Sequence, residues 1–213
     1  MPPVVSIVGH SNSGKTTLVE KLLLELRSRG YRVATIKHAQ DIDLDRPGTD
    51  SWRHVAAGSE SMVLATRDRA VLIKPVTSTP KLDELVQMIG EDYDIILAEG
   101  FKGEAAPKIE VQRNKTGPLL TDLKGLFAVV SDDAVETRAR KFGWGEVKSL
   151  VDLIEEGFIK PNPEHLSVYV NGNQISMTSF PREIVRNLMV AMVSSLKGAD
   201  VPRTIEFRLR KGP

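Results

Sequence analysis

The octapeptide GHSNSGKT at residues 9–16 constrains this chain more than any other part of its sequence. It matches the spacing G-x-x-x-x-G-K-[ST], in which small residues let backbone N–H groups surround a phosphate chain at the start of a helix. The lysine places a positive charge on the β- and γ-phosphates, and the threonine hydroxyl ligates Mg²⁺. We therefore expect a purine nucleoside triphosphate with Mg²⁺ to bind here, with Lys15 also acting in catalysis and Thr16 as a metal ligand. The loop residues expected to contact the nucleotide are Gly9, Ser11, Asn12, Ser13, Gly14, Lys15 and Thr16.

The segments on either side of this octapeptide have the patterns of a strand and a helix. Residues 4–8 are a short, mostly β-branched run, which is typical of a buried strand. Residues 17–29 place leucine and valine on one helical face and end before a glycine, and residues 32–37 are a second expected strand. This order predicts a parallel strand pair. The expected fold class is α/β, a P-loop NTPase with a mostly parallel twisted sheet and flanking helices.

Apolar runs and amphipathic segments continue to alternate along the first 159 residues. Further strands are expected at residues 62–65, 70–73, 93–98, 108–112 and 126–130, the first two forming a hairpin. Further helices are expected at residues 50–57, 79–89, 133–141 and 150–156.

The segment KPNPE at residues 160–164 is the clearest domain boundary, because two closely spaced prolines resist regular structure. We expect a P-loop domain at 1–159, a linker at 160–165 and a small C-terminal unit at 166–213. The pattern of this unit predicts an α+β arrangement of the type ββαβ, with a hairpin around Asn171-Gly172, a helix at 181–197 and a strand at 204–210. A unit of about fifty residues is marginal alone, so we expect it to pack on the first domain or on a second subunit.

A second motif is the apolar run Ile95-Ile96-Leu97-Ala98, which is followed by the acid Glu99 and by Gly100. Phosphate-binding loops work with a carboxylate at the end of a neighbouring strand, on the Mg²⁺ side of the nucleotide. Glu99 is the candidate for this role and for catalysis, by ligating the metal directly or through water, or by positioning a nucleophilic water. The Gly100 N–H is a candidate donor to the γ-phosphate.

Residues 41–51 form an acidic loop after the second expected strand. Its spacing does not fit an EF-hand. We interpret it as a switch segment that orders around Mg²⁺ and the γ-phosphate, with Asp43 or Asp45 facing the metal; a solvated surface loop is the alternative. Lys102 and Arg113 each follow an expected strand, and either could reach phosphate or a partner. Trp144 is expected to be a packing group.

Composition excludes several classes of function. The net charge of +1 gives no overall attraction to nucleic acid or to an anionic membrane. The sequence has no cysteine, which removes disulfides, thiolate metal sites and thiol catalysis and fits a reducing cytoplasm. Its four histidines show no zinc-binding spacing, and no apolar stretch is long enough to span a bilayer.

The base of the nucleotide is not determined by these motifs. Guanine recognition through Asn-Lys-x-Asp needs a carboxylate that the run Asn114-Lys115-Thr116-Gly117 lacks. The acids of Ser131-Asp132-Asp133 also follow an expected strand, where such a carboxylate could lie. The side-chain chemistry alone leaves both GTP and ATP open.

Several motifs in this order resemble the molybdopterin-guanine dinucleotide biosynthesis protein B (MobB) family. They are residues 9–17, Thr35-Ile36-Lys37-His38, residues 45–51, Ala57-Gly58 and Glu99-Gly100-Phe101-Lys102. The resemblance implies a homodimeric, GTP-binding adapter with weak GTP hydrolysis, which assists the guanylyltransferase that joins GMP to molybdopterin. It also implies that Gly14, Lys15, Thr16 and Thr17 bind phosphate and Mg²⁺, and that Glu99 and Gly100 form the γ-phosphate side.

Three other classes remain as alternatives. A small-molecule kinase would need an arginine-bearing lid, and Arg67, Arg69 and Arg113 form no obvious one. A nickel-type metallochaperone GTPase would need a cysteine- and histidine-rich metal site. A partitioning ATPase often carries an extra lysine after the first loop glycine, where this chain has His10.

Overall fold

The computed structural model describes residues 1–39, 46–161, 166, 168–171, 173–175, 177–197, 205 and 207. The chain divides into two compact units. Residues 2–163 form the larger unit, and residues 164–213 together with Met1 form the smaller one. The predicted last strand at 204–210 lies almost entirely outside the described residues, as does most of the predicted linker.

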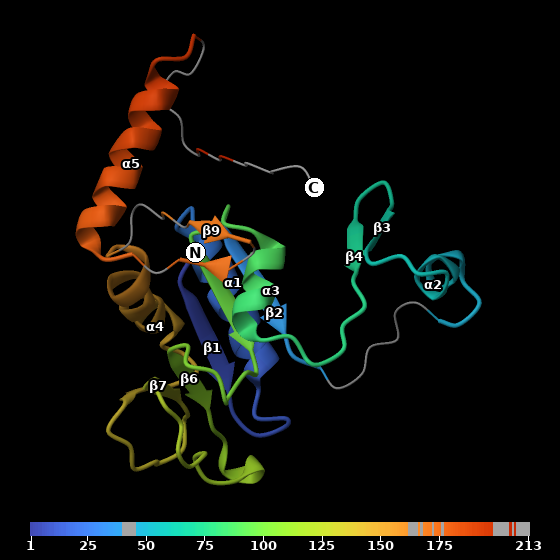
Figure 1. Ribbon diagram of the computed structural model, residues 1–213. Helices are drawn as coiled ribbons and strands as arrows, with labels where there is room; N and C mark the ends of the chain where they lie inside the picture. Colours follow the sequence, from blue (N-terminus) through green and yellow to red (C-terminus); the bar gives the residue numbers. More distant parts are fainter. Residues whose placement is uncertain are drawn as a thin grey trace. The chain divides into compact units, whose positions relative to one another are not determined.

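A six-stranded parallel sheet forms the centre of the larger unit (Figure 1). Its spatial order is β2-β5-β1-β6-β7-β8. The strands are β1 (Val4–Val8), β2 (Val33–Lys37), β5 (Ile95–Glu99), β6 (Lys108–Val111), β7 (Leu126–Val130) and β8 (Arg140–Phe142). The predicted α/β class with a mostly parallel sheet is confirmed. All six strands point the same way, so the residues that follow them meet at one edge.

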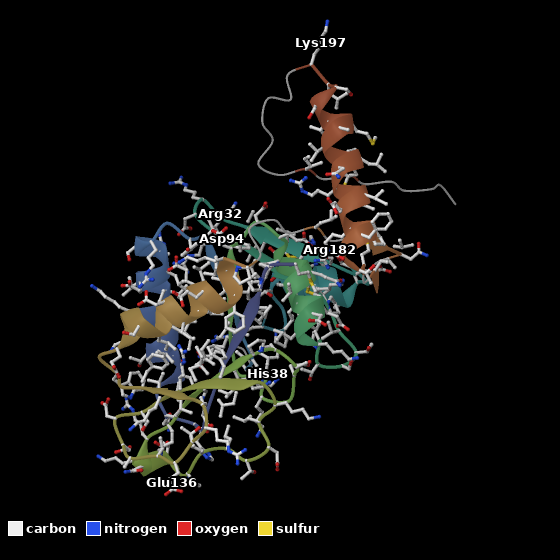
Figure 2. All side chains as sticks on the ribbon, turned by 90° about the vertical axis from the view of Figure 1, so that its left-hand side faces the viewer. Arg32, His38, Asp94, Glu136, Arg182 and Lys197 are labelled. Carbon is white, nitrogen blue, oxygen red and sulfur yellow. The ribbon has the colours of Figure 1, made fainter. Side chains whose placement is uncertain are left out.

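Helices cover both faces of this sheet (Figure 2). On one face, α1 (Lys15–Ser28) and α4 (Val147–Ile154) each bury one apolar side, which includes Leu22 of α1 and Leu150 of α4, against the strands. A short π-helical segment, Glu155–Ile159, continues from α4. On the other face lies α3 (Leu82–Ile89), which buries Leu82 and Val86. Figure 2 also orients the sheet: Arg32 and Asp94 lie toward the amino ends of the strands, and His38 toward their carboxyl ends.

The segment between β2 and α3 forms a separate helix and hairpin. Helix α2 (Asp50–Ala56) begins after Thr49, whose hydroxyl accepts a hydrogen bond from the Trp52 N–H at 3.3 Å. Strands β3 (Met62–Ala65) and β4 (Ala70–Ile73) then pair antiparallel, as predicted. This hairpin leaves Val63, Leu64 and Leu72 between 45% and 60% exposed.

The predicted helix at residues 133–141 is wrong. The chain from 133 to 139 is irregular, and β8 then begins at Arg140 and extends the sheet beside β7. The segment DAVETRARK at residues 133–141 has only small apolar residues and therefore no face with which a helix could join the core. A short strand instead satisfies the edge of β7 and lets Phe142 pack against the core cluster.

The smaller unit contains a hairpin and a helix. Strands β9 (Tyr169–Val170) and β10 (Asn173–Gln174) pair antiparallel around the predicted turn. Helix α5 (Ser179–Ser194) follows, beginning two residues before the predicted start at residue 181. The residues that the structure describes include no helix that is both long and apolar enough to cross a membrane.

Candidate nucleotide-binding site

The loop at residues 9–14 joins the end of β1 to the start of α1, as the motif predicts. Gly9 and Gly14 both have positive φ angles, 143° and 102°. A Cβ at Gly9 would overlap the Val111 carbonyl oxygen, and one at Gly14 would lie 2.7 Å from Cη2 of Trp144. Both positions therefore need glycine for conformation and for space. The loop ends where the free N–H groups of α1 begin, which is where an anion binds best.

The Lys15 side chain folds back over this loop. Its ammonium group donates to the carbonyl oxygens of His10 at 2.7 Å and of Gly9 at 3.2 Å. These bonds hold the positive charge inside the turn, among the backbone groups that the motif assigns to phosphate. Its predicted roles in phosphate binding and catalysis stay predictions.

The structure brings Thr16 and Glu99 together, although they are separated by 83 positions in the chain. Strands β1 and β5 are neighbours with Ile7 opposite Glu99, so the acid follows the strand beside the loop. The Thr16 hydroxyl lies 3.0 Å from each carboxylate oxygen of Glu99. The Glu99 side chain is only 14% exposed, and the Lys37 ammonium lies 3.5 Å from its Oε1. This pair joins a hydroxyl and a carboxylate at the start of α1.

The oxygens of Thr16 and Glu99 are of the kind that Mg²⁺ prefers. Mg²⁺ commonly takes one or two protein oxygens and fills its octahedron with phosphate oxygens and water. No group of three or more potential ligands from histidine, cysteine, aspartate or glutamate occurs within the described part of the chain. The pair therefore fits a metal held jointly by protein and nucleotide, and does not fit an all-protein metal cage.

Two other predicted residues lie in the turn after β5. The Gly100 N–H donates to the Ile7 carbonyl oxygen at 2.9 Å, so a bond to the γ-phosphate would require this hydrogen bond to break. Lys102 is exposed on the turn. Phe101 contacts the ring of His38 edge-on at 5.4 Å between centroids, which ties this turn to the end of β2. The roles of Gly100 and Lys102 stay predictions.

The acidic switch segment lies partly outside the described residues. Asp41, Asp43 and Asp45 belong to the range 40–45, so their predicted approach to the metal stays untested.

On the opposite side of β1 from Glu99, the ends of β6, β7 and β8 meet beside the loop. Arg113 stacks its guanidinium group on the Trp144 ring, with Cζ 4.6 Å from the ring centroid. The Trp144 N–H donates to Asp132 Oδ1 at 2.9 Å, and the Asn114 N–H donates to Asp133 Oδ2 at 2.6 Å. The sequence predicted Trp144 as a packing group, and the ring does contact the core cluster. The stacking of Arg113 on Trp144 was not predicted; the sequence placed Arg113 after an expected strand but put a helix where β8 precedes Trp144.

A buried pair holds two of these strand ends in register. The Ser131 hydroxyl donates to Gln112 Oε1 at 2.7 Å, and both residues are almost fully buried. Ser131 Oγ also accepts from the Asp133 N–H at 3.1 Å. The positions of Arg113 and Asp133 are thus set by a buried link between β6 and β7.

Burial shifts the pKa of two ionisable groups on β6. Desolvation raises the pKa of Glu110, whose Oε1 accepts from the Leu120 N–H at 2.7 Å. Desolvation lowers the pKa of Lys108, whose ammonium group contacts the carbonyl oxygens of Glu104, Ala106 and Lys124. These groups fix the loops before and after β6.

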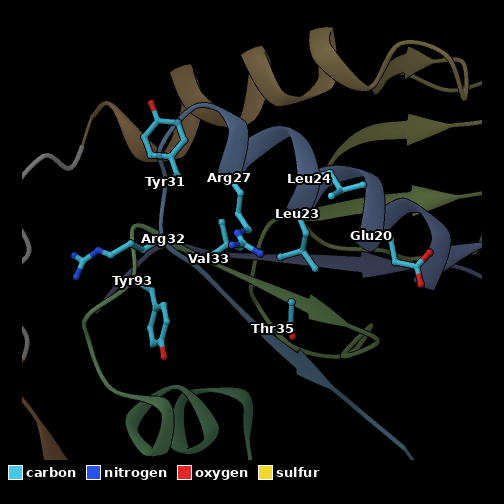
Figure 3. A pocket seen from close by; sticks show the side chains of 9 residues that line it. All are labelled: Glu20, Leu23, Leu24, Arg27, Tyr31, Arg32, Val33, Thr35 and Tyr93. Carbon is cyan, nitrogen blue, oxygen red and sulfur yellow. The ribbon is translucent and has the colours of Figure 1, made fainter. Parts of the chain in front are cut away.

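A separate groove of about 850 Å³ lies between α1 and the edge strand β2 (Figure 3). Leu23 and Leu24 of α1, Val33 of β2 and Tyr93 supply much of its apolar lining, and Arg27 lies among them. No residue of the phosphate loop lines it. The groove is therefore a candidate contact surface and not part of the nucleotide site.

Comparison with known proteins gives consistent matches. The family model described as "Molybdopterin guanine dinucleotide synthesis protein B" matches residues 4–132. The chain is 38% identical over 159 residues to a molybdopterin-guanine dinucleotide biosynthesis adapter protein of Haemophilus influenzae, covering 72% of this chain and 88% of that one. The adapter protein of Escherichia coli is 34% identical over 172 residues, covering 76% and 97%.

The fold also matches solved structures. A crystal structure of molybdopterin-guanine biosynthesis protein B superposes with a TM-score of 0.57 at 29% identity, covering 72% of this chain and 97% of that one. A homologue from Bacillus stearothermophilus gives a TM-score of 0.56 at 22% identity, covering 72% and 98%, and shows the fold alone. Among the sequence relatives, a putative adapter protein of Methanocaldococcus jannaschii is 27% identical, and the alignment covers 97% of each chain.

Proposed function

Because this chain belongs to the molybdopterin guanine dinucleotide synthesis protein B family, we propose that it is a GTP-binding adapter in molybdenum-cofactor guanylylation. It binds GTP with Mg²⁺, hydrolyses it weakly, and assists the guanylyltransferase that joins GMP to molybdopterin. The curated relatives carry the word adapter in their names, which supports this role over that of a kinase or a metallochaperone-type GTPase. We place this activity in the cytoplasm.

The observation that carries the proposal is the contact between Thr16 and Glu99 beside Lys15. The backbone N–H groups of residues 9–17 bind the β- and γ-phosphates, and Lys15 supplies the neighbouring positive charge. Mg²⁺, when bound, would supply positive charge beside the phosphate oxygens. Thr16 and Glu99 hold it, with Asp45 as a further candidate. The Glu99 carboxylate also orients the attacking water on the γ-phosphate side.

Weak hydrolysis is consistent with the surroundings of Glu99. Its carboxylate accepts from the Thr16 hydroxyl and lies near the Lys37 ammonium, so part of its acceptor capacity is already used. A site of this kind binds and orients a triphosphate more readily than it activates water. This matches a protein that presents GTP to a partner.

We further propose that the protein acts as a homodimer. The exposed apolar side chains of the β3–β4 hairpin and the apolar groove beside β2 are surfaces that another subunit would cover. We also keep the division into a P-loop domain at 1–159, a linker at 160–165 and a C-terminal unit at 166–213. In this arrangement the C-terminal unit strengthens the dimer or binds the partner enzyme.

A nucleotide-binding panel tests the proposal. Calorimetry with GTP, ATP and GDP is run on the wild type and on Lys15→Ala, with exposed Lys81→Ala as the matched control. We expect GTP preference, loss of triphosphate binding in Lys15→Ala, and no change in the control. Addition to purified guanylyltransferase should stimulate cofactor guanylylation. Unchanged affinity of Lys15→Ala would refute the site, and phosphate transfer to a small molecule would select a kinase.

A further inference from the structure

The ends of β6, β7 and β8 form a cluster of side chains that the phosphate chemistry does not use. We call Arg113, Asn114, Asp133 and Trp144 the base-side cluster. Its members come from three strand ends, and Trp144 also touches the phosphate loop at Gly14. The Arg113 Nη2 atom lies 3.2 Å from the position that a Cβ on Gly14 would take. The cluster is therefore in direct continuity with the loop.

The position of Glu99 fixes which way a bound nucleotide must run. Glu99 and Thr16 define the Mg²⁺ and γ-phosphate side, at the end of β5. The two neighbours of β1 in the sheet are β5 and β6. A triphosphate with its γ end toward β5 directs its nucleoside toward the ends of β6 and β7. Ligands of open parallel sheets bind outside the carboxyl ends of the strands, where the base-side cluster lies.

We infer that Asp133 reads the Watson–Crick edge of a guanine base, and that Arg113, stacked on Trp144, forms a wall against which the purine lies. This inference rests on the proposed function, since it requires a nucleoside triphosphate on the loop. It assigns base recognition to a carboxylate that follows β7, the strand next to β6, and not to the run Asn114-Lys115 that follows β6. The Asp133 carboxylate is held over the end of β6 by the Asn114 N–H at 2.6 Å.

The hydrogen-bonding chemistry of the Asp133 carboxylate and of the base edge explains the choice of guanine. A carboxylate is an acceptor with two oxygens and about four acceptor positions, so the bond from Asn114 leaves capacity for a ligand. Guanine presents two adjacent donors on this edge, at N1 and at the N2 amine. Adenine presents an acceptor at N1, which a carboxylate repels. The buried Gln112–Ser131 pair beneath Asp133 gives the fixed position that such discrimination needs.

The Arg113–Trp144 stack supplies contact without base selection. A planar guanidinium group stacks on aromatic faces and accepts a purine on its outer side. Arg113 is exposed, whereas Trp144 is partly buried against the core. The wall is thus rigid on its inner side and accessible on its outer side.

Asp133→Asn is the decisive variant. Asparagine keeps an acceptor for the Asn114 N–H but offers an N–H₂ group where the carboxylate had an oxygen. That group opposes the N2 amine of guanine and pairs with the O2 carbonyl of xanthine. Calorimetry with GTP, ITP, XTP and ATP should show that the variant loses GTP affinity roughly ten- to hundredfold and gains XTP affinity, as expected for hydrogen bonds to a charged group. Wild type should bind ITP more weakly than GTP.

Two neighbouring carboxylates serve as comparisons. Glu136→Gln, exposed in the same loop (Figure 2), should leave the base preference unchanged. Asp132→Asn should not switch the preference to xanthine, because Asp132 holds the Trp144 backbone. Arg113→Ala should weaken GTP and ATP by similar factors while leaving the binding of inorganic tripolyphosphate unchanged.

The outcomes separate this inference from the proposed function. If the wild type binds no triphosphate, the proposed function fails. If the wild type prefers GTP and Asp133→Asn still prefers GTP over XTP, the nucleotide site stands and the role of Asp133 is refuted. A variant that binds neither nucleotide also refutes it, because the substitution retains the contact to Asn114. A xanthine switch in Asp132→Asn instead would move the role to that residue and overturn the assignment.

Discussion

The Thr16 hydroxyl lies 3.0 Å from both carboxylate oxygens of Glu99. The contact joins the first turn of α1 to the end of β5, which are the two elements that flank a bound Mg²⁺ in P-loop proteins. In the proposed function, Glu99 lies on the γ-phosphate side and Lys15 contacts the phosphates. Substitutions at Lys15 and Glu99 should therefore have different effects.

Glu99→Gln is expected to reduce Mg²⁺-dependent GTP hydrolysis more than GTP binding. The amide is nearly isosteric and still contacts the Thr16 hydroxyl, but it lacks the negative charge that holds Mg²⁺ and orients water. We expect hydrolysis to fall roughly a hundredfold, and GTP affinity by less than about tenfold. Single-turnover hydrolysis and calorimetry measure the two effects. Glu84→Gln, exposed on α3, is the control, and equal hydrolysis in wild type and Glu99→Gln would remove Glu99 from the mechanism.

Gly14→Ala is expected to destabilise the fold and impair nucleotide binding together. Its Cβ would lie 2.7 Å and 3.0 Å from two carbons of the Trp144 ring, at a φ of 102°. Gly30→Ala is the matched control, because Gly30 also has a positive φ of 89° but has no atom within 4 Å of a new Cβ. The control should cost about 1 kcal/mol from backbone strain alone.

The overlap with Trp144 should add roughly 1–3 kcal/mol to the cost at Gly14. Urea unfolding of both variants measures the difference. Equal losses of unfolding free energy would mean that the Trp144 ring moves aside freely, and the ring would then not be a fixed part of the site.

The sequence was sufficient to predict that the phosphate-loop motif and Glu99 lie side by side. The octapeptide specifies a strand, a turn and a helix, and the acid after an apolar run specifies a neighbouring strand end, so Lys15, Thr16 and Glu99 could be placed together. Parallel order then follows from the strand–helix–strand pattern. These signals are local, or depend on a motif with one known geometry.

Of the base-side cluster, the sequence predicted only that Arg113 and the acids at residues 132 and 133 follow strands, and it did not predict that they meet Trp144. Arg113, Asp133 and Trp144 meet only because β6, β7 and β8 are consecutive in the sheet, and β8 lies where the sequence predicted a helix. Residues 133–141 have no strong strand pattern, and the pairing that makes β8 a strand comes from the free edge of β7. Without β8, the sequence offered no reason to place Trp144 beside Gly14.

Acid should weaken the contact of Arg29 and Tyr31, at the end of α1 and just after it, with Glu155 at the end of α4. We call this contact the Glu155 clamp. The Tyr31 hydroxyl and the Arg29 guanidinium donate to Glu155, which lowers the pKa of that carboxyl from 4.5 to about 2. A lowered pKa stabilises the fold at pH values above 4.5, and this contribution is lost as the pH falls through about 2. Glu155→Gln should therefore lose about 1 kcal/mol of unfolding free energy at pH 7. Urea unfolding should show this difference shrinking between pH 4.5 and pH 2; a constant difference would contradict it.

Alkali should also weaken the Glu155 clamp, because Tyr31 ionises at high pH. Burial, followed by the bond to Glu155, raises the pKa of this phenol from 10.0 to about 12. Because the folded state disfavours ionisation, the contribution is present below pH 10 and is lost as the pH rises through about 12. Tyr31→Phe should remove this dependence, which urea unfolding between pH 10 and pH 12 would detect.

The C-terminal helix should contribute to assembly and not to nucleotide binding. Ile184, Leu188 and Met192 of α5 recur every four residues and form one stripe, with exposures of 44%, 59% and 56%. An apolar stripe of this kind is normally covered by a partner. We expect Leu188→Lys, and deletion of residues 161–213, to reduce dimerisation or binding of guanylyltransferase while GTP affinity is kept.

Size-exclusion chromatography with light scattering measures the oligomeric state, and calorimetry with purified guanylyltransferase measures partner binding. Asn187→Lys introduces the same charge at an exposed polar position one residue away, and it should leave both assembly and partner binding intact. The archaeal relative is matched over 97% of this chain, whereas the two bacterial adapters are matched over 72% and 76% of it. The two bacterial adapters are thus matched over a smaller share of this chain than the archaeal relative is. If the deletion variant has the same number of subunits per particle and the same affinity for guanylyltransferase as the wild type, the tail has neither role.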